Sequence, residues 1–307
     1  MITAEKLEKH YGSTRAVDGL NFTVRPGVVT GFLGPNGSGK STTMRMIVGL
    51  DRPSGGSVQI DGKTHSGLHW PLREVGALLE ARAIHPGRSA YNHLRSLAVS
   101  NAIPKRRVDE VLEIAGLSEV AHKRAGKFSL GMGQRLGIAT ALLGDPGVLL
   151  FDEPINGLDP EGILWVRNLL SRLADEGRTV FVSSHLMSEM ALTATDLIVI
   201  GRGKLLAASS VEEFINSNTT ESFVVRSDDQ GRLAAALARS GASVVVNSNQ
   251  SLSISGVPSE KLGRIARDLS IALFELSSKR SSLEEVFMEL TNSSVEYHGR
   301  VSLEEAA

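Results

Sequence analysis

The stretch Gly34-Pro35-Asn36-Gly37-Ser38-Gly39-Lys40-Ser41-Thr42 decides the fold of this 307-residue chain. An apolar, β-prone run precedes it at residues 28–33, and a helix-like segment follows it at residues 43–50. A strand, a glycine-rich loop and a helix in this order are typical of a phosphate-binding loop (P-loop). The glycines let several backbone N–H groups point inward, and the helix N-terminus adds partial positive charge. The sequence therefore predicts binding of a nucleoside triphosphate.

Two side chains of the P-loop have expected roles of their own. We expect the Lys40 ammonium to reach the β- and γ-phosphates and the Ser41 hydroxyl to bind Mg²⁺. The predicted ATP-binding residues of the loop are Gly34, Pro35, Asn36, Gly37, Ser38, Gly39, Lys40, Ser41 and Thr42.

The composition limits the class of protein. Hydrophobic residues make up 41% of the chain, which supports an ordinary core, and a net charge of −1 argues against a broad nucleic-acid-binding surface. The absence of cysteine excludes disulfides, thiol catalysis and cysteine-ligated metals. The first residues lack the apolar segment of a signal peptide, and no run approaches the roughly 18 apolar residues of a membrane span. We therefore expect any membrane role to depend on a partner.

The first 210 or so residues alternate β-like and helical segments, which predicts an α/β domain with a mainly parallel sheet. The expected strands of this sheet are residues 28–33, 75–79, 148–152, 179–183 and 196–200, closed by a hairpin to 204–208. The expected helices are residues 41–50, 90–99, 106–115, 133–143 and 161–174. Additional antiparallel strands are expected at residues 2–9, 20–24 and 57–60. An inserted helical subdomain is expected at residues 81–130.

A second pattern starts after the polar run 216–221, which reads as a linker. The order strand 223–226, helix 231–240, strands 243–246 and 252–255, helix 259–269 and strand 271–276 is βαββαβ. This order predicts a small ferredoxin-like α+β domain over residues 220–290, with a polar turn at 247–250. Ser282 and Glu285 have the spacing of a helix-capping box, and residues 291–307 read as a loose tail. The first domain is accordingly assigned to residues 1–215.

Two consecutive carboxylates end the apolar strand 148–152. Downstream of a P-loop, Asp152 is suited to hold Mg²⁺, directly or through water, and Glu153 is placed to polarise an attacking water as general base. A solvated acidic turn is the alternative reading. With the P-loop, the pair predicts hydrolysis of the nucleotide.

Between these motifs, residues 128–135 read Phe-Ser-Leu-Gly-Met-Gly-Gln-Arg and run into a helix. Here the chain resembles the nucleotide-binding subunits of ABC transporters, whose signature is usually LSGGQ followed by x-Q-R. Ser129 and Gly131 match, whereas Leu130 and Met132 replace a glycine and a glutamine. The resemblance covers roughly residues 2–215. It implies that Ser129 and Gly131 bind the γ-phosphate of ATP held by a second copy of the chain, consistent with an anion site at a helix N-terminus.

The same resemblance implies roles for four further residues. Tyr11 matches the aromatic that stacks on adenine, with Val17 packed nearby, although a lone tyrosine is often plain surface or core. Residues 156–159 (Asn-Gly-Leu-Asp) match the D-loop, whose Asp159 communicates across the dimer. His185 matches the switch histidine, which contacts the γ-phosphate and orients Glu153; a histidine there is otherwise structural.

Glu80 departs from the family pattern, which has glutamine at the end of the strand 75–79. A carboxylate is a suitable oxygen ligand for Mg²⁺, so Glu80 is a predicted metal residue together with Ser41 and Asp152. An exposed loop acid is the alternative.

The variant signature, Glu80 and the residues 282–291 resemble the ATPase subunits of bacitracin- and daunorubicin-type exporters. This resemblance implies an ATP-driven motor that forms a homodimer and works on separate permease subunits at the cytoplasmic face of the membrane, without nucleic acid. The alternative functions are an ABC ATPase that acts on ribosomes or DNA and a small-molecule kinase. The C-terminal domain is expected to hold protomers together, with a ligand sensor as its alternative role.

Overall fold

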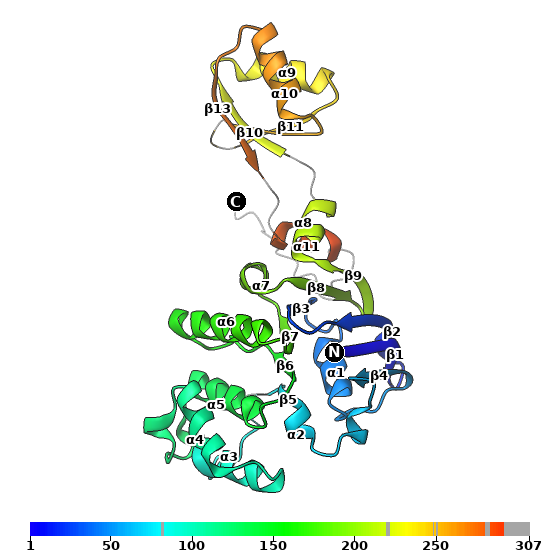
Figure 1. The fold of residues 1–307 in the computed structure, drawn as a ribbon. Helices are drawn as coiled ribbons and strands as arrows, with labels where there is room; N and C mark the ends of the chain where they lie inside the picture. The colour runs from blue at the N-terminus through cyan, green and yellow to red at the C-terminus, as the bar shows by residue number, and fades with distance from the viewer. Residues whose placement is uncertain (81–82, 219–221, 248, 250, 280–282, 292–307) are drawn as a thin grey trace, which may run out of the picture. The chain divides into compact units, whose positions relative to one another are not determined.

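A computed structural model describes residues 1–80, 83–218, 222–247, 249, 251–279 and 283–291 (Figure 1). It divides into two compact units, one built chiefly from Met1–Val211 and the other from Glu212–Glu289. The boundary therefore falls ahead of the predicted linker, because the helix α8 (Val211–Asn218) occupies the start of that polar run.

The first unit alternates strands and helices along most of its length. Its strands are β1 (Ile2–Tyr11), β2 (Thr14–Val24), β3 (Val29–Leu33), β4 (Gly55–Ile60), β5 (Val75–Leu78), β6 (Val148–Asp152), β7 (Thr179–Ser184), β8 (Asp196–Gly201) and β9 (Lys204–Ser210). Its α-helices are α1 (Lys40–Ile47), α2 (Pro71–Glu74), α3 (Ala90–Ser100), α4 (Lys105–Ile114), α5 (Leu130–Leu142), α6 (Pro160–Asp175) and α7 (Met187–Thr193), and short 3₁₀ turns lie at His65–Gly67, Ser118–Val120 and Ala125–Lys127.

A six-stranded sheet forms the centre of this unit, in the order β5-β6-β7-β3-β8-β9. All neighbouring pairs are parallel except the β8–β9 hairpin. The strands β3 and β7 are buried along their whole length, as expected for strands covered on both faces of a parallel sheet. These findings confirm the predicted α/β fold with a mainly parallel sheet and an antiparallel addition.

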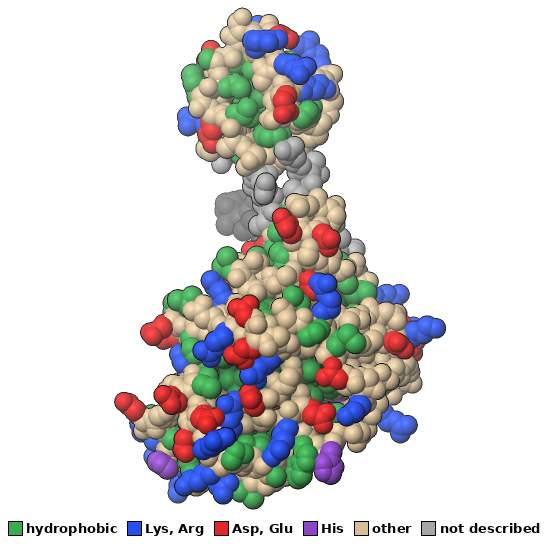
Figure 2. Space-filling view, in the orientation of Figure 1, with side chains coloured by type: hydrophobic (Ala, Val, Ile, Leu, Met, Phe, Trp, Pro, Cys, Tyr) green, Lys and Arg blue, Asp and Glu red, His purple; other side chains and the backbone are tan. Residues whose placement is uncertain are grey.

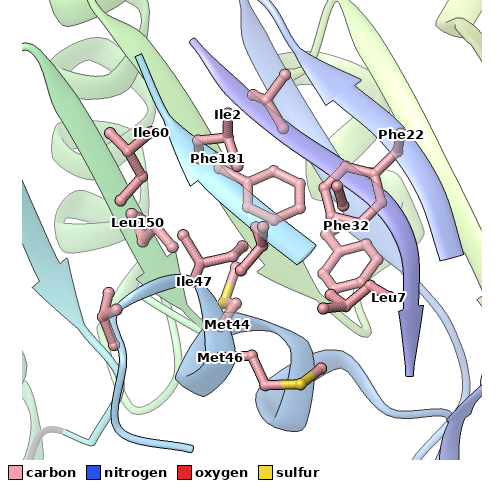
Figure 3. Packing of buried hydrophobic residues seen from close by; sticks show 14 of the residues in the cluster. Ile2, Leu7, Phe22, Phe32, Met44, Met46, Ile47, Ile60, Leu150 and Phe181 are labelled. Atoms are coloured by element: carbon pink, nitrogen blue, oxygen red, sulfur yellow. The ribbon is translucent and has the colours of Figure 1, made fainter. Parts of the chain in front are cut away.

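The second sheet of this unit has the order β2-β1-β4, and both of its pairs are antiparallel. The helix α1 lies between this sheet and the six-stranded one, whereas α6 lies on the opposite face of the large sheet (Figure 1). Side chains of both sheets and of α1 form one buried cluster (Figure 3). Within it, the rings of Phe32 and Phe181 stack with centroids 4.9 Å apart, and Phe22 lies about 6 Å from each. The P-loop thus starts from a rigid core.

Between β5 and β6 the chain forms helices α3, α4 and α5 (Figure 1). The helix α4 is amphipathic and buries Val108, Val111 and Leu112, whose spacing places them on one face. The helix α5 begins at Leu130, three residues earlier than the sequence predicts, because Ser129 caps it. Its side chain accepts a hydrogen bond from the Met132 N–H at 3.2 Å. The signature residues therefore form the first turn of α5.

The second unit contains β10 (Ser222–Ser227), α9 (Gln230–Arg239), β11 (Ser243–Val246), β12 (Leu252–Ser255), α10 (Ser259–Asp268), β13 (Leu273–Lys279) and most of α11 (Leu283–Thr291), besides α8. Its sheet has the order β11-β12-β10-β13, with every neighbouring pair antiparallel. The two helices α9 and α10 pack on it through Leu233, Leu237 and Leu262, all fully buried. This unit has a hydrophobic core of its own.

Several expectations differ from the structure or lie outside it. The strand β2 begins at Thr14 rather than at residue 20, because its first half also pairs with β1, through several register shifts. The helices α2, α7 and α8 were not predicted from the sequence. Some predicted features lie outside the described residues: Ser282 of the expected capping box, residues 248 and 250 of the expected turn, residues 219–221 of the linker and residues 292–307 of the tail.

The aromatic cluster generates a stability prediction. The substitution Phe181→Ala removes a fully buried ring and is expected to cost about 3–5 kcal/mol. The melting temperature of the first unit should fall on the order of 10 °C, measured by calorimetry. The same change at Phe274, whose side chain is 69% exposed in the second unit, is the matched control and should shift melting by about 1 °C or less. Equal effects at the two positions would contradict the packing described here.

Candidate functional site

A cavity of about 320 Å³ lies at the carboxyl ends of the central strands. In parallel sheets this edge is where ligands bind, because the loops that follow neighbouring strands converge there. The cavity is lined by Ala16, Asn36, Gly37, Ser38, Gly39, Lys40, Ser41, Thr42, Leu79, Asp152 and Glu153. The structure therefore brings together the P-loop after β3 and the two carboxylates after β6, as the sequence predicts.

The P-loop is held against β2 by a close backbone approach. Gly39 has φ +104°, and a Cβ at this position would lie 2.4 Å from the Ala16 carbonyl oxygen. Only glycine fits this conformation and this gap. Val17 is fully buried beside it, so its side chain supports the loop from the core. Gly34 and Pro35 do not line the cavity, but their carbonyl oxygens accept hydrogen bonds from Lys40.

Lys40 is the buried cation of the site, with 7% of the residue exposed. Its Nζ donates to Gly34 O at 2.5 Å and to Pro35 O at 3.3 Å. Burial lowers the pKa of Lys40, and the carboxylates of Glu153 and Asp152 oppose that shift. An anion beside the ammonium would offset the same desolvation, so the geometry favours a ligand that carries negative charge.

Ser183 of the neighbouring strand β7 contacts both acidic residues, Asp152 through its side chain and Glu153 through its backbone. The Ser183 hydroxyl donates to Asp152 Oδ1 and accepts a hydrogen bond from the Glu153 N–H at 3.0 Å. Glu153 has φ +52°, a left-handed conformation that is uncommon for a residue with a side chain and that clusters at functional sites. Both acids line the same cavity although they are adjacent in sequence.

His185 lies just beyond the end of β7 and reaches Glu153. Its Nδ1 is 2.8 Å from Glu153 Oε2, and its side chain is 47% exposed. A carboxylate in contact with an imidazole at the mouth of a phosphate-binding cavity is suited to orient and deprotonate a water molecule. The predicted pairing of these two residues is therefore present in the geometry.

Tyr11 lies close to the P-loop without lining the cavity. Its ring is exposed, its hydroxyl donates to Asp51 Oδ2 at 3.0 Å, and Lys9 Nζ lies 5.0 Å from the ring centroid. Burial and the Asp51 carboxylate raise the pKa of the Tyr11 hydroxyl, while a hydrogen bond with Thr42 acts the other way. The role of Tyr11 in stacking on adenine stays a prediction.

Ser129, Gly131 and Asp159 lie away from the cavity of their own chain. Asp159 caps α6 by accepting a hydrogen bond from the Gly162 N–H at 2.8 Å, as Ser129 caps α5. The D-loop packs against the signature residues, since a Cβ at Gly157 would lie 2.2 Å from Leu130 Cδ2. The starts of α5 and α6 therefore form one surface.

Glu80 is exposed and is not among the residues that line the cavity. Leu79, the residue before it, lines the cavity. The role of Glu80 as a metal residue stays a prediction.

Two residues that organise the site carried no predicted role. Ser183 links the Asp152 carboxylate to the backbone N–H of Glu153, and the buried Gln134 of α5 donates from Nε2 to the Glu153 carbonyl oxygen at 2.9 Å. The signal for Ser183 was a hydroxyl directly after the apolar run 180–182, two residues before His185. Gln134 stood in the signature stretch, but a glutamine on a helix gives no indication of burial by itself.

None of the helices in the described part of the chain has the length and hydropathy needed to cross a membrane. Comparisons with known proteins give direct information on the family of the chain. A family model described as ABC transporter matches residues 17–156, and one described as a domain of unknown function matches residues 221–284.

Relatives match one or both units. The chain is 36% identical over 308 residues to the uncharacterized ABC transporter ATP-binding protein YhcH of Bacillus subtilis, with 96% of this chain and 97% of the relative covered. It is 44% identical over 209 residues to the bacitracin transport ATP-binding protein BcrA of Bacillus licheniformis, covering 67% of this chain and 68% of the relative. A dimeric structure of the ATP-binding cassette MJ0796 with ADP and Pi superimposes with a TM-score of 0.64 at 26% identity, covering 69% and 99% of the two chains. The chain therefore belongs to the ABC transporter ATP-binding proteins, which hydrolyse ATP to power transport.

Proposed function

We propose that this chain is the motor subunit of an exporter for an antibiotic, drug or other hydrophobic compound, and that a separate permease carries the substrate. The proposed ATPase activity rests on one observation. Lys40, Asp152 and Glu153 line the same cavity, and His185 contacts Glu153. The bacitracin transport relative supports the substrate class. The permease would hold the protein at the cytoplasmic face of the membrane.

ATP binding is assigned to the P-loop and Tyr11. The inward N–H groups and the α1 N-terminus suit the phosphates, Lys40 suits the β- and γ-phosphates, and the exposed Tyr11 ring suits adenine. The cavity volume of about 320 Å³ lies within the usual range for small-molecule sites.

The donor set at the cavity fits Mg²⁺. The Ser41 hydroxyl and the Asp152 carboxylate are hard oxygen ligands that line the same space, and two protein ligands are usual for Mg²⁺ that also binds phosphates. When bound, the ion would neutralise charge on the phosphates. Its ligands in this proposal are Ser41 and Asp152, because Glu80 does not line the cavity.

Hydrolysis is assigned to Glu153 and His185. Glu153 accepts a proton from the attacking water as general base, and His185, at 2.8 Å from its Oε2, keeps the carboxylate oriented.

The active assembly in this proposal is a homodimer with two composite sites. Ser129 and Gly131 at the start of α5, with Asp159 at the start of α6, are free of the cavity in their own chain and so can face the nucleotide of a second copy. The N-terminus of α5 is suited to bind a γ-phosphate. Because ATP contacts both protomers only in the closed dimer, it selects that state, and hydrolysis releases it.

The alternative of an ABC ATPase that acts on ribosomes or DNA is less well supported. Acidic and basic side chains are interspersed over the visible face of the first unit (Figure 2), and the net charge is −1. A nucleic-acid partner favours a basic surface. Co-purification with a multi-span permease would support transport, and co-purification with ribosomes or DNA would overturn it.

The assignment of Glu153 predicts a trapped dimer. The variant Glu153→Gln should bind ATP, hydrolyse it at least about 100-fold more slowly, and accumulate as an ATP-dependent dimer in size-exclusion chromatography. Glu161→Gln, at an exposed acid of α6, is the control and should retain normal turnover. Normal turnover in Glu153→Gln would exclude Glu153 as the base.

The metal assignment predicts a shifted requirement for Mg²⁺. Removal of Mg²⁺ with EDTA should stop hydrolysis. The variant Ser41→Ala should need about tenfold more Mg²⁺ for half-maximal activity, the factor that corresponds to about 1.4 kcal/mol of binding free energy. Glu80→Gln should leave this concentration within about twofold. If Glu80→Gln raised this Mg²⁺ concentration more than Ser41→Ala does, Glu80 would be a ligand of the metal.

The second unit is proposed to hold protomers together when ATP is absent, in preference to sensing a ligand. It has its own core and, among its described residues, exposes Val245, Val246 and Phe274 on its sheet. Deletion of residues 212–307 should abolish nucleotide-free self-association in analytical ultracentrifugation and preserve ATP binding. Unchanged self-association of the truncated protein would contradict this role.

A further inference from the structure

The peptide that carries Glu153 is fixed from two directions. Its N–H donates to Ser183 Oγ at 3.0 Å and to the Ser183 carbonyl oxygen at 3.3 Å, which anchors it to the sheet. Its carbonyl oxygen accepts from Gln134 Nε2 at 2.9 Å, which ties it to α5. The φ of +52° at Glu153 persists only where the surroundings hold it. Gln134 therefore supports an unfavourable backbone conformation from the helix side.

Gln134 is suited to this task by its burial and its position. Only 3% of the residue is exposed, and a buried amide donor needs a partner, which here is the Glu153 carbonyl. Gln134 lies five residues after Ser129 on the same helix, about 7.5 Å along its axis. One short, rigid segment thus joins the signature residues to the peptide of Glu153.

We propose that Gln134 is a positioning residue for ATP hydrolysis. Its amide keeps the Glu153 peptide in the left-handed conformation and thereby aims the Glu153 carboxylate at His185 and the attacking water. This inference rests on the proposed function, in which Glu153 is the general base. It adds that the position of α5, which a nucleotide on the partner protomer would influence through Ser129, sets the geometry of the base in the chain's own site.

The variant Gln134→Met tests this role because it removes the amide and keeps a side chain of similar length. The kcat of ATP hydrolysis should fall about tenfold, equivalent to about 1.4 kcal/mol, while the KM for ATP stays within about twofold. The variant should also accumulate the ATP-dependent dimer. The control Thr140→Val removes a hydrogen bond within α5, from Thr140 Oγ1 to Leu136 O, and should leave kcat within about twofold.

A double-mutant cycle separates positioning from a general structural role. In the Glu153→Gln background, Gln134→Met should cause no further slowing of phosphate release in single-turnover measurements, since the group that it positions is gone. A further tenfold loss there would overturn the inference and leave the role of Glu153 intact. Normal turnover in Glu153→Gln alone would instead reject the proposed base and this inference with it.

A second variant covers the case in which methionine disturbs folding. At pH 8, Gln134→Glu keeps the shape of the side chain but presents a carboxylate without a donor. Its kcat should fall at least as far as that of Gln134→Met. Wild-type kcat in either folded variant would overturn the proposal.

Discussion

The parallel pairing of β6, β7 and β3 is the constraint on which the site depends. Asp152 stands opposite Ser183, and Leu33, the last residue before the P-loop, stands opposite Ser184. This register brings the ends of three strands to one level, although the residues are far apart in sequence. A slip of one residue would turn the side chains of a strand to the other face of the sheet, and it would separate Ser183 from the Asp152 carboxylate and the Glu153 N–H. The buried aromatic cluster on this sheet opposes such a slip.

Oppositely charged side chains lie close together in the site. The buried Lys40 faces two carboxylates, and its ammonium is bonded to backbone oxygens of the P-loop. Such a cation is costly to desolvate unless anions surround it. A polyphosphate would add a further anionic partner for this ammonium, and a metal ion bound with it would offset part of the added negative charge.

Much of the first unit was predictable because local patterns and tertiary structure agree there. The P-loop, the buried strand 148–152 and the alternation of strands and helices each indicate the same fold, and the convergence of Lys40, Asp152 and Glu153 follows from parallel topology. The contacts of Gln134 and Ser183 were not predictable, since a glutamine or a serine carries no sign of its tertiary partner. The start of β2 was missed because its exposed, polar first half forms a strand only by pairing with β1. Glu80 was assigned to the metal from the family pattern; it does not line the cavity, and its role stays a prediction.

The contact between Leu130 and Gly157 has a consequence for protein engineering. The leucine fills the space above the glycine, and any side chain at position 157 would collide with it. The signature and the D-loop are therefore matched in size and behave as one module. A chimeric cassette that takes one of these segments from another protein would need the other segment from the same donor, or it would contain either a steric clash or a void.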